Sequence, residues 1–161
     1  MPGLPPLIEE DVQALDAALD ELLRRSDATV ALVIDKGGPV IQQRGAVGKF
    51  DTVTIAALAA GSFSATQAIA ERLEETHFGS IYQQGERLSL LFCDIDDSTL
   101  LLVIFNAGLS AGAVKYYAAD AVRSILRQLE AARRRAPGES LDLVSENLAD
   151  TSGIFGRKPK N

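Results

Sequence analysis

TVTIAALAAGSFSATQAIA, residues 52–70, contains no charged side chain, although it lies between Asp51 and Glu71. Alanine is the best helix former, and Asp51 is placed to cap the amides of a first helical turn. The segment therefore predicts a long helix. Because an uncharged helix must be covered on nearly every side, and because small residues let another backbone come close, we expect a second chain to supply part of the cover.

Two stripes run along this predicted helix. The first carries the large apolar side chains and recurs at the helical period, so it is expected to face the protein's own core; its members are Ile55, Leu58, Ser62, Ile69 and Leu73. The second stripe holds nothing larger than alanine or serine and is expected to be left for a partner; its members are Ala57, Gly61, Ser64, Ala65 and Ala68.

A membrane span and a fully buried helix would also account for the uncharged segment. A membrane span needs about twenty predominantly apolar residues. Here threonine, serine and glutamine dilute the segment, and Glu71, Arg72, Glu74 and Glu75 follow it directly, which argues against a span. A helix buried wholly within its own domain stays open as an alternative to a partner surface.

The composition favours a single cytoplasmic domain. At 161 residues the chain has the length of one domain. Its net charge of −6 argues against nucleic acid or an anionic membrane as the main partner, since both require a basic surface. The single cysteine, Cys93, excludes an internal disulfide, and no signal peptide is evident at the N-terminus. We therefore expect a cytoplasmic location.

The remaining segments complete an α-β-β-α-β-β-β-α order, which predicts an α+β domain with a five-stranded antiparallel sheet and helices on both faces. Each predicted strand is short and bounded by turn residues. The predicted elements outside the central helix are an amphipathic helix over 8–25, strands over 29–34, 39–43, 80–84, 88–93 and 99–105, and a last helix that begins near Ser110 or Ala111 and ends at 133–135.

The predicted domain boundaries follow changes in composition. Residues 1–7 are expected to be an N-terminal tail, 8–135 the domain, and 136–161 a flexible C-terminal tail. Pro137 and Gly138 are expected to break the last helix. An alternative for the tail is a segment that folds against a partner, because it contains a short apolar pattern at Leu141, Val144 and Leu148, followed by Ile154 and Phe155.

No constellation of catalytic residues is evident. His77 is alone, Cys93 lies in an apolar strand without a neighbouring base, and there is no phosphate-binding glycine motif. The acidic group at 94–97 lacks the glycine and glutamate of a calcium loop, so we interpret it as a turn. The sequence thus predicts no catalytic residue, cofactor or metal. Arg72 and Arg87 are candidates for an arginine finger inserted into another protein, or else ordinary surface charge.

Several segments resemble the roadblock (dynein light chain-like) domain family, and within it the MglB branch of bacterial polarity proteins. They are the run 31–38 (ALVIDKGG), the helix 58–66 (LAAGSFSAT), the turn 84–86 (QGE), the strand 101–105 (LLVIF) and the helix start 110–115 (SAGAVK). The resemblance covers about residues 8–132.

The resemblance implies a homodimer in which the third strands pair edge to edge and the central helices lie side by side. It also implies that this helix platform binds a Ras-like small GTPase of the MglA type, in cell polarity or gliding motility, and accelerates GTP hydrolysis without an inserted arginine. By position, the GTPase-binding role falls on Ala57, Gly61, Ser64, Ala65 and Ala68, and the dimer interface on Ser80, Ile81, Tyr82, Gln83 and Gln84. A non-enzymatic roadblock scaffold and a purely structural homodimer remain alternatives.

Overall fold

The computed structural model describes residues 3–149, with side-chain environments through residue 135. In this part of the chain, one sheet of five antiparallel strands carries helices on both faces, in the predicted α-β-β-α-β-β-β-α order. The elements are α1 (Glu9–Ser26), β1 (Val30–Asp35), β2 (Val40–Gly45), a short 3-10 turn (Val47–Lys49), α2 (Thr52–Arg72), β3 (Ser80–Gln83), β4 (Leu88–Asp94), β5 (Thr99–Asn106) and α3 (Ala111–Ala149). The predicted fold class is confirmed.

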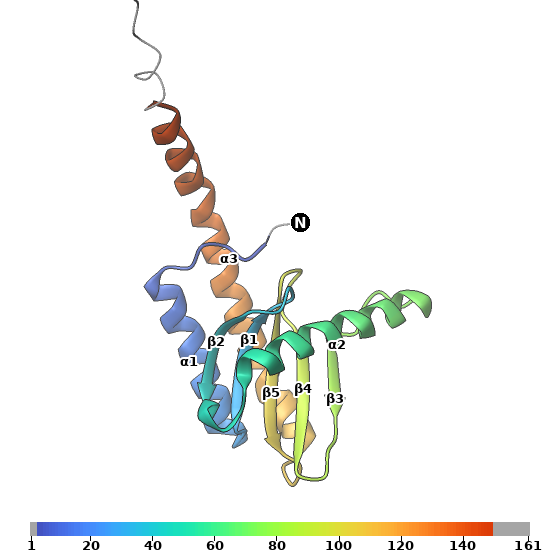
Figure 1. Ribbon diagram of the computed structural model, residues 1–161. Coiled ribbons are helices and arrows are strands. Elements are labelled where there is room, and N and C mark those ends of the chain that lie inside the picture. Colours follow the sequence, from blue (N-terminus) through green and yellow to red (C-terminus); the bar gives the residue numbers. More distant parts are fainter. Residues whose placement is uncertain (1–2, 150–161) are drawn as a thin grey trace, which may run out of the picture.

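The strands lie in the order β2-β1-β5-β4-β3, so β5 is central and β2 and β3 form the two edges. α1 and α3 cover one face of the sheet and α2 crosses the other (Figure 1). β5 is apolar on both sides, as expected for a strand between two helix layers. Leu101, Val103 and Phe105 join the α1/α3 side, and Leu100, Leu102 and Ile104 join the α2 side.

The α1/α3 layer holds the larger of the two hydrophobic clusters. Leu15, Leu19 and Leu22 of α1 pack with buried residues of α3 such as Ile125 and Leu129. The helical spacing of these residues is the pattern that predicted both helices. Residues before α1 also join this layer: Pro5 is buried and Leu4 packs against the cluster, so the segment predicted as a free tail lies partly on the domain.

α3 is longer than the sequence predicts. The expected stop at Pro137 is wrong, because the helix continues to Ala149 and projects beyond the sheet (Figure 1). A proline removes one backbone hydrogen bond, but the bonds on either side can still carry a helix past it. Ile154 and Phe155 of the predicted tail lie outside the described residues.

Candidate interaction surface

The predicted N-cap of α2 is present. Asp51 accepts hydrogen bonds from the Thr54 backbone N–H (3.2 Å) and from the Thr54 hydroxyl (2.6 Å). These bonds, the hydroxyl's first, hold the pKa of Asp51 below its usual value. The carboxylate therefore remains charged at neutral pH, where it offsets the positive end of the helix dipole.

The buried face of α2 is mostly small, which contradicts the predicted assignment of the large stripe to the core. Phe63 and a row of alanines pack against large apolar residues of β1, β4 and β5; these alanines are Ala56, Ala59 and Ala60. Ala70, farther along the helix, is also buried. Because the strands already fill this layer with leucine, isoleucine and valine, the helix needs small residues to approach them closely.

The large stripe is exposed instead. In the single chain the exposed fraction is 68% for Leu58, 56% for Ile69 and 66% for Leu73, while Ile55 is half-buried. Isolated exposed apolar residues are common on proteins, but these follow one side of one helix. An aligned row of this kind indicates a surface that another molecule covers.

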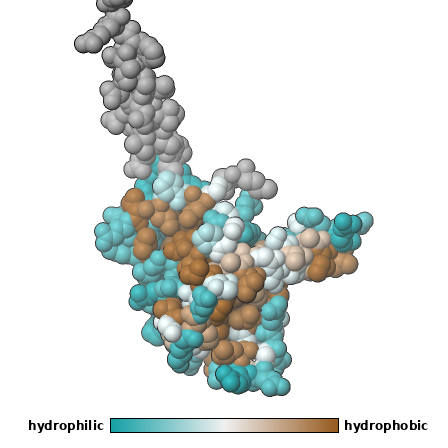
Figure 2. Space-filling model, viewed as in Figure 1, coloured by the Kyte–Doolittle hydropathy of each residue, from teal (hydrophilic) through white to brown (hydrophobic). Residues whose placement is uncertain are grey.

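This row borders a groove of about 280 Å³ between α2 and the strands beneath it. Ile55, Leu58 and Ser62 form the helix side, and Gln83, Leu90 and Phe92 supply much of the strand side. Figure 2 shows apolar surface over the strands below the helix and along the lower side of its projecting end. The groove thus joins the large stripe of α2 to the β3 side of the sheet.

The predicted GTPase-binding residues are all exposed on the outer side of α2: Ala57, Gly61, Ser64, Ala65 and Ala68. Ala57 lies against the β1–β2 turn, where a Cβ on Gly38 would be 3.7 Å from the Ala57 Cα. A Cβ on Gly61 would meet no atom within 4 Å. These positions therefore present a low, accessible surface, and their role in GTPase binding stays a prediction.

The predicted dimer strand is an edge of the sheet. β3 pairs with β4 alone, so its other side carries unpaired backbone groups. Tyr82 is 43% exposed and its ring stacks on Phe105 at 6.1 Å, on the α1/α3 side. α2 runs diagonally over β3 and extends past this edge (Figure 1). An open edge beside an overhanging helix is a surface that invites a further strand.

The polar residues considered for chemistry have structural partners. Asp94 forms an ion pair with Lys36 at 2.7 Å, and Asp96 accepts hydrogen bonds within its turn from Ser98 and Thr99. Burial by itself would raise the pKa of Asp96, but the hydrogen bonds of Thr99 and Arg133 lower it. In the described residues, no group of three or more His, Cys, Asp or Glu is placed to hold a metal ion.

Cys93 and the two candidate arginines likewise show no activating partner in the described part of the chain. Burial raises the pKa of the Cys93 thiol to about 11, so little reactive thiolate is present at neutral pH. Arg72 and Arg87 are exposed, and among residues 3–135 neither forms an ion pair.

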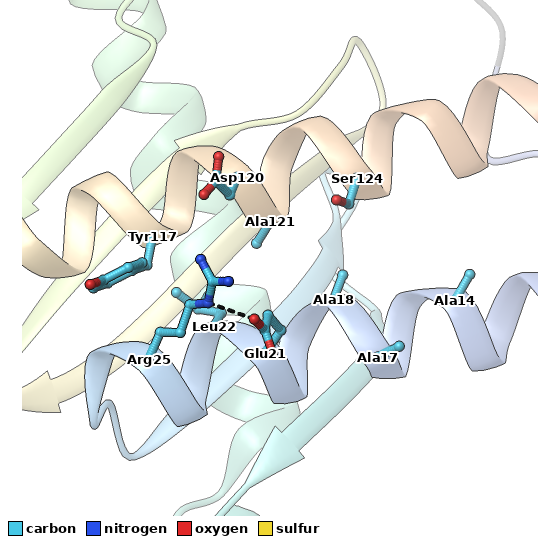
Figure 3. A pocket seen from close by; sticks show the side chains of 10 residues that line it. All are labelled: Ala14, Ala17, Ala18, Glu21, Leu22, Arg25, Tyr117, Asp120, Ala121 and Ser124. Atoms are coloured by element: carbon cyan, nitrogen blue, oxygen red, sulfur yellow. Dashed lines mark ion pairs between the residues drawn. The ribbon is translucent and has the colours of Figure 1, made fainter.

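A second groove, of about 370 Å³, lies between α1 and α3 on the opposite face (Figure 3). Its floor contains Ala14, Ala18 and Ala121, and its rim charges pair with one another: Arg25 with Glu21, and Arg123 with Asp120. Arg25 also lies over the Tyr117 ring, 5.9 Å from its centre. The groove therefore forms where small side chains leave space between two packed helices. The charges at its rim are already paired.

α2 is also long and apolar enough to cross a membrane, and it is the one such helix among the described residues. However, Ala56, Ala60 and Phe63 are buried against the sheet, although only 28% of the apolar window is buried in the single chain. One side of α2 therefore packs on the sheet of the domain.

Known proteins share this architecture. The MglB of Myxococcus xanthus is 27% identical, with 79% of this chain and 96% of that chain covered and a TM-score of 0.74. The gliding protein MglB of Thermus thermophilus is 30% identical, with 81% and 98% covered and a TM-score of 0.74. A structure described as MglB with a tetrameric arrangement is also 30% identical. It covers 82% of this chain and 99% of that chain, with a TM-score of 0.75. No curated protein matches the chain.

The similarity spans nearly the whole length of these MglB structures, so it includes both helix layers and the complete sheet. The model of the Roadblock/LC7 domain matches residues 14–105, which run from α1 through β5 and include α2 and β3. The order of elements agrees with this match throughout. The chain belongs to the Roadblock/LC7 domain family.

Proposed function

We propose that the protein is a homodimer that binds a Ras-like small GTPase through α2 and accelerates its GTP hydrolysis, in the polarity or gliding motility of a bacterial cell. The observation that carries this proposal is the likeness to MglB over 96% or more of the MglB chains, at 27–30% identity. A site built from surfaces fits a regulator, because Asp94 and Asp96 have structural partners and the Cys93 thiol is buried with a raised pKa.

The open edge of β3 and the large stripe of α2 support the dimer. Pairing two β3 strands about a twofold axis makes one continuous sheet and removes both open edges. The overhanging half of each α2 then lies over the partner's sheet, where Ile69 and Leu73 are covered, and the partner's helix covers Leu58. Burial of three such side chains stabilises the dimer by several kcal/mol, at about 1.5–3 kcal/mol for each fully buried one.

The small stripe of α2 then remains for the GTPase. Gly61, Ser64 and Ala68 lie on the helix side away from the β3 groove and are exposed. Two such helices side by side form a low platform, against which a flat or helical segment of another protein can pack closely. This platform would hold the GTPase's switch segments in the arrangement that stabilises the charge of the transition state.

Size-exclusion chromatography with light scattering tests this proposal. The protein alone is expected to have the mass of a dimer. Added to the Ras-like GTPase of the same organism, it is expected to form a complex with the form loaded with a GTP analogue and not with the GDP form. A monomer, or no complex with either form, would contradict the proposal. A complex that leaves hydrolysis unchanged would instead support the scaffold alternative.

A further inference from the structure

The side-chain amide of Gln67 holds both backbone groups of Phe78. Its Nε2 donates to the Phe78 carbonyl at 3.0 Å, and its Oε1 accepts from the Phe78 N–H at 3.2 Å. Gln67 lies on α2 and Phe78 lies two residues before β3. These two bonds are the same pair that one residue of an adjacent antiparallel strand would make. The side chain therefore occupies the place of a neighbouring strand at Phe78.

The pairing with β4 shows which groups of β3 remain open. The Asp94 N–H donates to the Gly79 carbonyl at 2.9 Å, and the strand register places Ile81 opposite Phe92. Since hydrogen-bonded and non-bonded residues alternate along an antiparallel pair, Gly79 and Ile81 face β4. Ser80 and Tyr82 then direct their N–H and C=O groups to the open edge.

We infer that Gln67 sets the register in which a second copy of this chain pairs with β3. This inference rests on the proposed homodimer. With Phe78 occupied, a second β3 strand can use only Ser80 and Tyr82 within the strand. The arrangement that uses both residues on both copies is centred on Ile81, with Ser80 opposite Tyr82 of the second copy.

The alternative registers lose hydrogen bonds because of Gln67 or because of the strand's length. A register centred on Ser80 needs Phe78 to pair with Tyr82 of the second copy, and Gln67 already holds Phe78. A register centred on Tyr82 needs Gln84, which lies beyond the end of β3. If Gln67 did not hold Phe78, the register centred on Ser80 would form more hydrogen bonds between the two strands than the register centred on Ile81.

Disulfide cross-linking of full-length protein measures the register. Single cysteines are placed at Ser80, Ile81 or Tyr82 in a Cys93→Ala background, because Cys93 lies opposite Ser80 in β4. Symmetry-related cysteines at the centre of the register lie about 4.5–5.5 Å apart between Cα atoms, within disulfide range. Ile81→Cys is therefore expected to cross-link on the order of tenfold faster than Ser80→Cys or Tyr82→Cys, as the lost hydrogen bonds imply.

Gln67→Met then removes both bonds while keeping the length of the side chain. We expect it to shift cross-linking from Ile81→Cys toward Ser80→Cys. Gln67→Glu, which keeps the acceptor for the Phe78 N–H and loses the donor, is expected to give a smaller shift and serves if the methionine variant does not fold. Gln13→Met is the matched control, because Gln13 is exposed on α1, and it should leave the ratio unchanged.

The outcomes separate this inference from the proposed function. If the dimer keeps the same cross-linking ratio in Gln67→Met and Gln67→Glu, the role of Gln67 is overturned and the homodimer stands. The same holds if Ile81→Cys is not the fastest variant to cross-link when Gln67 is present. A protein that is monomeric in every variant, as expected if β3 pairs with a strand of another protein, overturns the homodimer and the inference with it.

Discussion

Asp11 and Arg135 form an ion pair that joins the first turn of α1 to α3 across 124 positions of sequence. The Asp11 side chain is fully buried, and it also accepts from the Ile8 N–H (2.9 Å) and from Gln128 Nε2 (2.6 Å). Beyond Arg135, α3 continues to Ala149, and its last part projects beyond the sheet (Figure 1). The pair therefore anchors the start of the projecting part of α3 to the α1/α3 layer.

Replacement of Asp11 is expected to destabilise the fold. Asp11→Ala leaves the Ile8 N–H, Gln128 and Arg135 without this acceptor, which should lower the free energy of unfolding by about 2 kcal/mol, because a carboxylate hydrogen bond is worth more than a neutral one. Urea titration measures the difference. Glu10→Ala, at an exposed neighbouring position, is the control and should change stability by less than about 0.5 kcal/mol. An equal effect of both variants would contradict the role of Asp11.

Asp11 is also expected to contribute to the loss of folding stability in acid. The Arg135 hydrogen bond, followed by those from Ile8 and Gln128, lowers the pKa of Asp11 from 3.8 to about 2 against the opposing effect of burial. Because the pKa is lower in the folded state, the contribution of Asp11 is fully present above pH 3.8 and is lost as the pH falls toward 2. Stability measured across this range should fall less steeply in Asp11→Ala than in the parent.

The two sides of α2 should respond differently to truncation. Phe63→Ala is expected to cost about 3–5 kcal/mol of stability, because Phe63 is 2% exposed against the sheet. Leu58→Ala should leave the stability of the single chain nearly unchanged and weaken the dimer, because Leu58 is 68% exposed. Unfolding at low protein concentration and sedimentation across a concentration series separate the two effects. A large loss of single-chain stability in Leu58→Ala would show that this side chain is covered by its own domain.

A long charged side chain on the small stripe should prevent GTPase binding. Ser64→Arg and Ala68→Arg are expected to abolish the complex while the protein remains a dimer, since arginine blocks the close approach that serine and alanine allow. Ala113→Arg, at an exposed position of α3 on the other face, should bind as the parent does. Titration calorimetry measures the affinity and light scattering the mass. Loss of the dimer in Ser64→Arg would place the small stripe in the dimer interface instead.

The proposal also predicts that the exposed arginines are dispensable. Arg72→Ala and Arg87→Ala should each change stimulated GTP hydrolysis by less than about tenfold, whereas loss of an arginine finger reduces the rate by about 10³–10⁵. Stopped-flow or quench measurements at saturating protein make the comparison independent of binding. A loss of about a thousandfold in either variant would identify that residue as a finger.

The sequence predicts the order of elements well because strong local patterns mark each of them. The central position of β5 follows from its apolar residues on both faces, and the start of α2 follows from Asp51. The sizes of the side chains on α2 mislead about which side of this helix is buried. The size of Leu58 and Ile69 suggests the core, but the sheet already supplies large residues, so the helix contributes alanines and Phe63 there.

A signal for the buried side is nevertheless present. Phe63 shares a helical face with Ala56, Ala59, Ala60 and Ala70, and one aromatic among alanines fits a helix packed closely on a sheet of branched residues. The contact of Gln67 with Phe78 has no such signal, because the sequence around a glutamine on a helix does not indicate which group its side chain binds. Such contacts depend on the path of the loop after α2.

Single-turnover GTP hydrolysis by the Ras-like GTPase of the same organism shows directly whether the protein activates it. The GTPase is loaded with GTP and mixed with saturating dimer, and phosphate release is followed with the parent and with Ser64→Arg. We expect the parent to raise the hydrolysis rate and Ser64→Arg to leave it at the intrinsic rate. A complex that forms with the parent and leaves the hydrolysis rate at its intrinsic value would contradict it.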